Sequence, residues 1–348
     1  MPPYEATRYR NRPRESGRNL RHFTVQPPFD GDPDADVILQ SSDGVKFLVI
    51  KSILAHGSTF FKTMLTLPQP PNRAPLPKDP MFSTGSPTES GLPVIPMTES
   101  DAKTIDVFLR ILYPITSPDI KDLNLVDSLL KVGVKYDFDL VVDRAKDELC
   151  NSIVRDEDNA IKVFGIACRY RLDDTARLAS YMTLKKPFCS RLTPDFEELK
   201  MRDFYCLFDY YRKVVTAVRS LFLDEQSGVS YCRNITHSIL DRSGRCPRSH
   251  RGEVITRSHD ESGVVDVVEQ VYFLGWWIAF RNSLYIKIAQ GPASEKLVTF
   301  EAIWREVKAC CPHCQATVEM DLRYGLADVV NAEIKRLINS VSLEIPWD

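Results

Sequence analysis

Two cysteines near the end of the chain have the spacing of a metal-binding pair. Cys311 and Cys314 form a Cys-x-x-Cys motif that is followed by a helical pattern. Two thiolates at this spacing can point at one zinc ion, with about 2.3 Å between each sulfur and the metal. A structural zinc site holds four ligands, so the motif predicts one half of a site and requires partners from elsewhere in the chain.

The expected partners lie in the polar segment 224–263. Cys232 and Cys246 would complete a four-cysteine site for one structural zinc ion, and His237 or His250 could replace either of them. Cys310 is expected to be a spare, because the side chain next to a ligand is expected to point elsewhere. Four thiolates leave no position for water, so the predicted role of the metal is structural.

Two other chemistries remain open for the Cys-x-x-Cys pair. It could be a redox pair, although the strand and helix alternation that accompanies thioredoxin-like motifs is missing around it. It could also consist of ordinary reduced cysteines. The chain has nine cysteines in all, an odd number without the spacing of a disulfide scaffold. This favours a reducing compartment, so we expect a cytoplasmic or nuclear protein.

The sequence offers no motif for catalysis. It contains no GxSxG, no glycine-rich phosphate loop and no HExxH, and we therefore expect a protein that is not an enzyme. The first residues lack the apolar core of a signal peptide, and the longest apolar run, at 271–280, is too short to span a bilayer. No membrane association is expected.

Arginines gather in two places. Six of them lie between Arg8 and Arg21, and a second group is in the polar segment: Arg242, Arg245, Arg248, Arg251 and Arg257. Both groups could contact phosphate. A net charge of only -2 gives no global attraction to nucleic acid, and acidic residues are interspersed in the second group, so nucleic acid is not the expected partner.

The elements that must position these residues fall into five segments. Residues 1–33 are expected to be a disordered, arginine-rich tail. Residues 34–150 begin with a hairpin of strands at 36–39 and 45–49, continue with two short helices to residue 67, and carry a Pro- and Ser-rich loop at 68–93. A further strand and several short helices complete this segment. Because such short helices must share a core, it is predicted to be one compact α+β domain.

The rest of the chain is predicted to be mostly helical. Residues 151–223 read as a helical extension that follows without a Gly- or Ser-rich linker. Residues 224–263 are expected to be a disordered polar loop, and residues 264–348 a helical region that carries the Cys-x-x-Cys motif. With 348 residues, 43% of them hydrophobic, the chain is long enough to bury the cores of two domains.

The hairpin and the two helices after it resemble the first half of a BTB (POZ) domain. Seven positions fall in register with the family pattern: Phe47, Lys51, Leu54, Ala55, Ser58, Phe61 and Met64. The resemblance covers about residues 36–150, and the segment after it is similar to the helical extension of many fungal members. The fold class implied is α+β, a BTB/POZ domain with a small sheet and a cluster of short helices, followed by a mostly α-helical C-terminal half.

This resemblance implies an interaction protein. Its expected partners are a second copy of the chain, giving a homodimer through the BTB domain, and a protein recruited by the helical half, with a cullin and a ubiquitin-ligase adaptor role as one version. Two departures from the family pattern bear on this. Ile50 replaces the usual histidine, and the Pro-rich insertion has no clear hydrophobic-x-Glu contact for a cullin. The alternative is a transcription-associated or nucleic-acid-binding regulator that uses the Arg-rich tail and loop.

Asp36 and Lys51 are the expected partner-binding residues of this domain. Both are charged residues within apolar runs of the hairpin, so both are expected to be partly buried. In related domains the matching pair lines a pocket at the dimer surface. The alternative for this chain is a structural ion pair that fixes the register of the hairpin.

Overall fold

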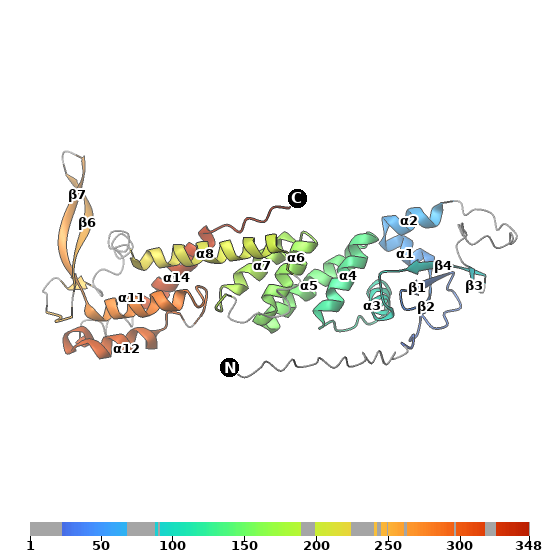
Figure 1. Ribbon diagram of the computed structural model, residues 1–348, viewed down its shortest axis with the longest axis horizontal. Helices are drawn as coiled ribbons and strands as arrows, with labels where there is room; N and C mark the ends of the chain where they lie inside the picture. The colour runs from blue at the N-terminus through green and yellow to red at the C-terminus, as the bar shows by residue number, and fades with distance from the viewer. Residues whose placement is uncertain are drawn as a thin grey trace, which may run out of the picture. The chain divides into compact units, whose positions relative to one another are not determined.

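The computed structural model describes most of the chain. The described residues are 23–67, 88–89, 91–188, 199–223, 240–241, 245–248, 250–260, 263–295, 297–316 and 325–347. The chain divides into two compact units, one made of residues 1–119 and 135–141 and the other of residues 120–134 and 142–348. The elements of both are labelled in Figure 1.

The first unit contains a small sheet in the strand order β2-β1-β4-β3. β1 pairs with β2 antiparallel and with β4 parallel, and the strands are β1 (Val37–Ser41), β2 (Lys46–Val49), β3 (Thr88–Glu89) and β4 (Leu92–Met97). Gly44 has a φ of 84°, the left-handed conformation that this tight turn needs and glycine adopts without strain. The predicted hairpin is confirmed.

Three short helices cover this sheet: α1 (Lys51–Gly57), α2 (Thr59–Thr66) and α3 (Ala102–Leu112). Phe61, Phe108 and Phe138 are fully buried, and their rings lie 4.9 to 5.5 Å apart along the series. A buried side chain of this size contributes about 1.5–3 kcal/mol relative to an exposed one. The shared core therefore explains how helices this short persist.

Part of the predicted tail is ordered. Residues 23–33 include Phe29, which is fully buried and lies 4.9 Å from the ring of Tyr113 and 6.5 Å from that of Phe47. The Leu48 amide also donates a hydrogen bond of 2.9 Å to the Phe29 carbonyl. Phe29 lies among prolines and aspartates without any periodic pattern, which is why the sequence did not reveal its burial. Residues 1–22 lie outside the described part of the chain.

The second unit is mostly helical. α11 packs against both α8 and α12, and α14 packs against α8. The helices are α4 (Leu123–Lys135), α5 (Asp139–Arg155), α6 (Ala160–Arg169), α7 (Asp173–Thr183), α8 (Met201–Leu223), α11 (Gly275–Ile288), α12 (Phe300–Cys310) and α14 (Leu326–Ser340). A search of the described helices finds none that combines the length and the apolar character needed to cross a membrane.

The prediction that residues 224–263 form a disordered loop is wrong for residues 250–260. β6 (His250–Asp260) and β7 (Gly263–Phe273) form a long antiparallel hairpin, visible in Figure 1, and β5 (Leu240–Asp241) pairs with β7. The helix expected from residue 264 begins instead at Gly275. Residues 264–268 hold four valines, and β-branched residues favour a strand over a helix. The interspersed charges hid this preference.

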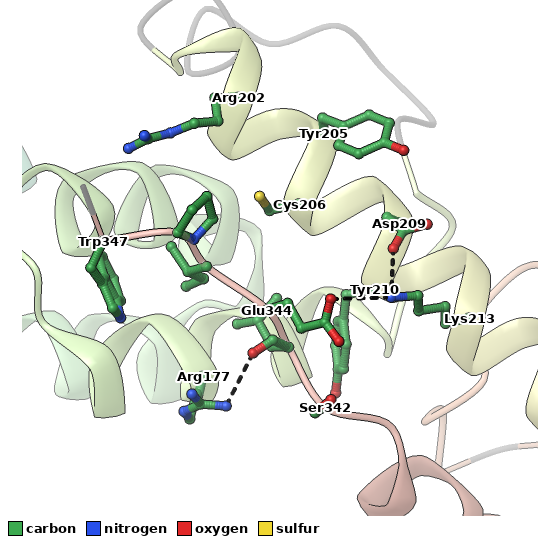
Figure 2. Close-up of a pocket in the computed structure, with 13 residues that line it drawn as sticks. Arg177, Arg202, Tyr205, Cys206, Asp209, Tyr210, Lys213, Ser342, Glu344 and Trp347 are labelled. Carbon is green, nitrogen blue, oxygen red and sulfur yellow. Dashed lines mark hydrogen bonds and ion pairs between the residues drawn. The ribbon is translucent and has the colours of Figure 1, made fainter.

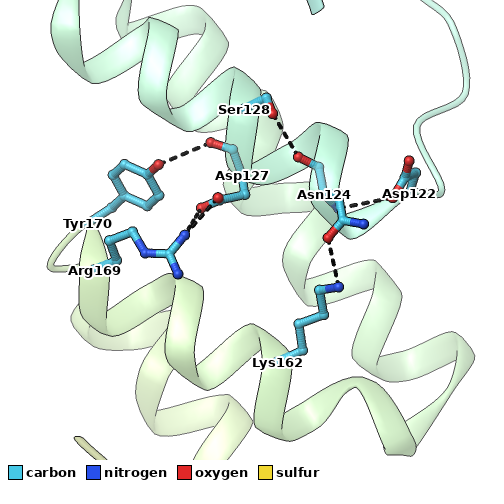
Figure 3. Close-up of polar contacts among 7 residues, drawn as sticks. All are labelled: Asp122, Asn124, Asp127, Ser128, Lys162, Arg169 and Tyr170. Atoms are coloured by element: carbon cyan, nitrogen blue, oxygen red, sulfur yellow. Dashed lines mark hydrogen bonds and ion pairs between the residues drawn. The ribbon is translucent and has the colours of Figure 1, made fainter. Parts of the chain in front are cut away.

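The predicted domain boundary at residue 150 falls inside a helix. α5 continues to Arg155, and Ile153 is fully buried. Polar contacts then join α4 to α6, as Figure 3 shows: the Asp127 carboxylate accepts two hydrogen bonds of 2.7 Å from Arg169, and its carbonyl accepts one of 3.1 Å from the Tyr170 hydroxyl. These hydrogen bonds therefore fix α4 directly to α6, a helix of the predicted extension at 151–223.

Candidate functional site

Four cysteine sulfurs of the second unit converge on one point. The Sγ atoms of Cys246, Cys310, Cys311 and Cys314 all lie within 4.8 Å of one another. Cys246 is 3.7 Å from Cys310, 3.9 Å from Cys311 and 3.5 Å from Cys314, and Cys310 is 3.5 Å from Cys314. None of the four is in a disulfide, and Cys246 and Cys314 are buried. The cluster has the composition and the size of a metal centre.

Cys310, which was expected to be a spare, is part of this cluster. It is the last residue of α12, and the chain then becomes extended at Cys311, with φ -162° and ψ 163°, before residues 312–316 turn helical again. This break turns two adjacent thiols toward the same point. The prediction that Cys310 points away is therefore wrong. Cys232 and His237 lie outside the described residues, and His250 begins β6.

Backbone amides hold the sulfurs in place. Burial disfavours a thiolate at Cys246, but the amides of Gly275 and Arg248 donate hydrogen bonds to its sulfur and hold its pKa below the ordinary value. The Cys314 amide donates to the Cys311 sulfur at 3.4 Å. Burial raises the pKa of Cys310 to about 11 and raises that of Cys314 further. Metal binding by this cluster would require the thiols to lose their protons.

Gly275 and Arg248 are the supporting residues that sequence reasoning missed. A Cβ atom on Gly275 would lie 2.5 Å from the Arg248 Cβ and 2.8 Å from its carbonyl oxygen, so only glycine allows this approach. The Arg248 guanidinium donates to the Ala309 carbonyl at 3.1 Å. This arginine, considered for phosphate binding, instead ties the cysteine loop to the end of α12. In the sequence, the position of Gly275 directly before the Trp276–Trp277 pair was the local feature that could have marked this close approach.

The structure brings Asp36 and Lys51 together, through the backbone. The Lys51 amide donates a hydrogen bond of 2.6 Å to the Asp36 carboxylate, and the Asp36 amide donates one of 3.1 Å to the Val49 carbonyl. Lys51 is the first residue of α1, so Asp36 satisfies an amide that the helix itself leaves unpaired. Both side chains are half-buried. This contact fixes where the hairpin ends and the helix starts.

Tyr113 completes the support of this helix end. Its hydroxyl accepts a hydrogen bond of 2.9 Å from the amide of Ile50, the residue that replaces the family's usual histidine. Burial raises the pKa of Tyr113, and the carboxylates of Asp32 and Asp36 add to that rise. The Tyr113 hydroxyl, just after the end of α3, therefore helps to fix the position of Ile50.

The same unit exposes large apolar side chains. Phe60 is 44% exposed, Leu67 59% and Leu140 57%, whereas Phe61 is in the core. Phe60 remains in contact with the core through the Tyr136 ring, 5.5 Å away. Exposed apolar side chains of this size are typical of protein contact surfaces when they lie together.

The architecture of β1 to α5 can now be compared with known families. Residues 27–153 match the BTB/POZ domain model. The match covers about a third of the chain, and it includes both the buried Phe29 and the part of α5 beyond residue 150. The predicted fold class is confirmed: a BTB/POZ domain with a small sheet and helices, followed by a mostly helical half. No curated protein matches the chain.

The BTB/POZ domain is a protein-interaction module, and the helical half that follows it also has a recess in its surface. A cavity of about 660 Å³ lies in the helical half between α7, α8 and residues 342–347 (Figure 2). Arg177 donates to the Leu343 carbonyl at 3.3 Å, and Lys213 pairs with Glu344 at 3.7 Å. Burial raises the pKa of Cys206, which also lines the cavity.

Proposed function

We propose that this protein is an interaction scaffold that self-associates through its BTB/POZ domain and recruits a partner protein through its helical half. The observation that carries the proposal is the match of residues 27–153 to a module that mediates protein interactions and often dimerises. The exposed side chains of Phe60 in α2 and of Leu67 directly after it support the proposal, because they supply apolar area that the domain leaves uncovered. The proposed role is not enzymatic.

The face of α8 beside the cavity is the proposed partner site. Met201 is 78% exposed, Tyr205 65% and Phe208 43%, and Tyr205 lines the cavity of Figure 2. Aromatic side chains next to a recess are the usual anchors of protein interfaces. Phe208 is held in place by Phe204, whose ring stacks with it at 6.3 Å. This face therefore presents ordered aromatic side chains to a partner.

A ubiquitin-ligase adaptor is one form that such a scaffold takes. In this version a cullin would bind the BTB/POZ domain, while the helical half would hold the protein to be modified. The BTB/POZ match supports the first contact. The missing hydrophobic-x-Glu element of the Pro-rich segment weakens it, and residues 68–87 of that segment lie outside the described part of the chain.

Affinity purification of the tagged full-length chain with mass spectrometry tests this proposal. We expect a Tyr205→Ala, Phe208→Ala double variant to lose the partner of the helical half and to keep its second copy. The matched control is Ile286→Ala, which removes an apolar side chain that is 62% exposed on α11 and should lose nothing. A Phe60→Asp, Leu67→Asp variant should instead lose its second copy and keep the partner of the helical half. Identical recovered proteins for all four chains would overturn the proposal.

The cullin is scored in the same samples. Recovery of a cullin by the wild type and by the α8 variant, but not by the α2 variant, would support the adaptor version. Recovery of no cullin by the wild type would reject the adaptor version while the scaffold proposal stands. A cullin lost only from the α8 variant would contradict the assignment of the two surfaces.

A further inference from the structure

We infer that Cys246, Cys310, Cys311 and Cys314 bind one zinc ion as a closed four-thiolate site. This assignment does not depend on the proposed scaffold function. The residues come from two places far apart in the sequence, the turn at 245–248 and the break after α12. The set replaces the sequence-based ligand set, because Cys310 occupies the position that had been assigned to Cys232.

The distances fit a tetrahedron around one ion. Zinc binds thiolates at about 2.3 Å in tetrahedral geometry, which requires about 3.8 Å between any two sulfurs. The four sulfur–sulfur distances around Cys246 and Cys314 run from 3.5 to 3.9 Å. A disulfide would bring two sulfurs to about 2.0 Å. The sulfurs are therefore spaced as ligands of one metal and not as oxidised pairs.

The chemistry of the donor set favours zinc over iron. A tetrahedral set of four sulfurs is typical of zinc or of iron, and a given site binds Zn²⁺ more tightly than Fe²⁺. The mutual separation of at most 4.8 Å suits a single ion. All four positions of the tetrahedron are filled by protein, so the ion would have no open position for water or substrate. The site is therefore structural.

The surroundings offset the negative charge of such a centre. Four thiolates and one Zn²⁺ carry a net charge of -2, which needs nearby donors when it is partly buried. The amides of Gly275 and Arg248 point at the Cys246 sulfur, and the Cys314 amide points at that of Cys311. Gly275 is also the first residue of α11, whose N-terminal end is electropositive. These donors form the second shell that metal-bound thiolates require.

The bound ion would join three elements. The turn at 245–248, the start of α11 and the end of α12 all meet at the cluster. Because the four ligands converge only in the folded chain, the binding free energy of the metal is folding free energy for this region. Metal binding would therefore help to order the short turn at 245–248, between β5 and β6.

The test begins with the native full-length chain, purified without chelator. Elemental analysis should find one zinc per chain. Alkylation followed by mass spectrometry should then modify Cys150, which is half-buried elsewhere, and leave the four ligands protected until a chelator removes the metal. Cys310→Ser and Cys314→Ser should each weaken zinc binding at least tenfold, whereas Cys150→Ser should retain one zinc. The alkylation experiment uses the wild-type chain, so its result does not depend on whether a variant folds.

Each opposite result rejects the assignment. A metal-free chain whose melting temperature and alkylation pattern do not respond to chelator or added zinc would overturn the site. A disulfide among the four cysteines would assign the cluster to redox chemistry. Stoichiometric iron with its visible colour would reject zinc. Protection of Cys232 with free alkylation of Cys310 would show that the ligand set is wrong.

Discussion

Ser58 shows how one hydroxyl can define a local structure. Its oxygen accepts a hydrogen bond of 3.0 Å from the Phe61 amide at the start of α2, and its hydroxyl donates to the Tyr136 carbonyl. The side chain is buried, so a replacement would leave both partners unsatisfied. We expect Ser58→Ala to reduce the free energy of unfolding by about 1–3 kcal/mol in urea denaturation.

The control for Ser58 is Thr63→Ala on the same helix. Thr63 also donates a hydrogen bond, to the Thr59 carbonyl, but it is exposed, so its loss should change stability by less than about 0.5 kcal/mol. Equal effects of the two substitutions would show that the cap has no special role.

Gly275 limits the approach of the cysteine turn to α11. Gly275→Ala would place a Cβ atom 2.5 Å from that of Arg248, so either the turn or the helix must move. We expect the melting temperature to fall and the affinity for zinc to drop by at least tenfold, measured by competition with a chromogenic chelator. Gly31→Ala is the matched control, since nothing lies within 4 Å of its Cβ position. An unchanged zinc affinity in Gly275→Ala would contradict the geometry of the cluster.

At the scale of elements, the contact between α4 and α6 can be measured directly. The Arg169 and Asp127 side chains are 38% and 29% exposed, so solvent screens part of their attraction. Both carboxylate oxygens accept from one guanidinium nitrogen, so the contact is charge-assisted but lacks the second nitrogen of a bidentate pair. We expect a double-mutant cycle with Asp127→Ala and Arg169→Ala to give a coupling of about 0.5–1 kcal/mol. A coupling near zero in low salt would mean that apolar packing alone joins the two helices.

The helices of the second unit bury neutral groups that ionise at high pH. Burial is the main cause that raises the pKa of Tyr210 to about 12, and it does the same for Tyr170 and Cys168. The unfolded chain loses the tyrosine protons near pH 10, before the folded chain does. The stabilising contribution of the two tyrosines is therefore complete below pH 10 and is lost between pH 10 and 12, whereas that of Cys168, whose ordinary pKa is 9.0, begins to be lost near pH 9.

Tyr210→Phe tests this pH dependence. The variant should lose less stability than the wild type between pH 10 and 12, measured by urea unfolding at each pH. Tyr205→Phe is the control on the same helix, because Tyr205 is 65% exposed. If both variants follow the wild-type curve, the ionisation of Tyr210 does not contribute to alkaline unfolding.

Local patterns explain which elements the sequence could predict. After the Gly44 turn, β2 alternates more exposed and buried positions, and Ile105, Phe108 and Leu109 lie at helical spacing, so both elements follow from periodicity. Phe29 and Cys310 depend on residues distant in the chain, which no local pattern records. The β6–β7 hairpin was hidden by charged residues among the valines, although β-branched residues favour strands.

At the scale of the whole molecule, the BTB/POZ match and the helix boundaries bear on how the chain can be divided. The match extends to residue 153, and α5 ends at Arg155. A fragment ending at residue 150 would cut this helix and remove the buried Ile153. A fragment ending at 155 would still remove Arg169 and leave Asp127 without its partner. Experiments on the intact chain with point variants therefore test the two halves more cleanly than deletions do.

The central claim is that the chain self-associates through its BTB/POZ domain, and light scattering after size-exclusion chromatography tests it most directly. At tens of micromolar, we predict that the full-length protein has at least twice the 39.7 kDa mass of one chain. Phe60→Asp with Leu67→Asp should return it to the mass of one chain while its circular dichroism stays that of the wild type. A wild-type protein that remains a strict monomer at these concentrations would contradict the account.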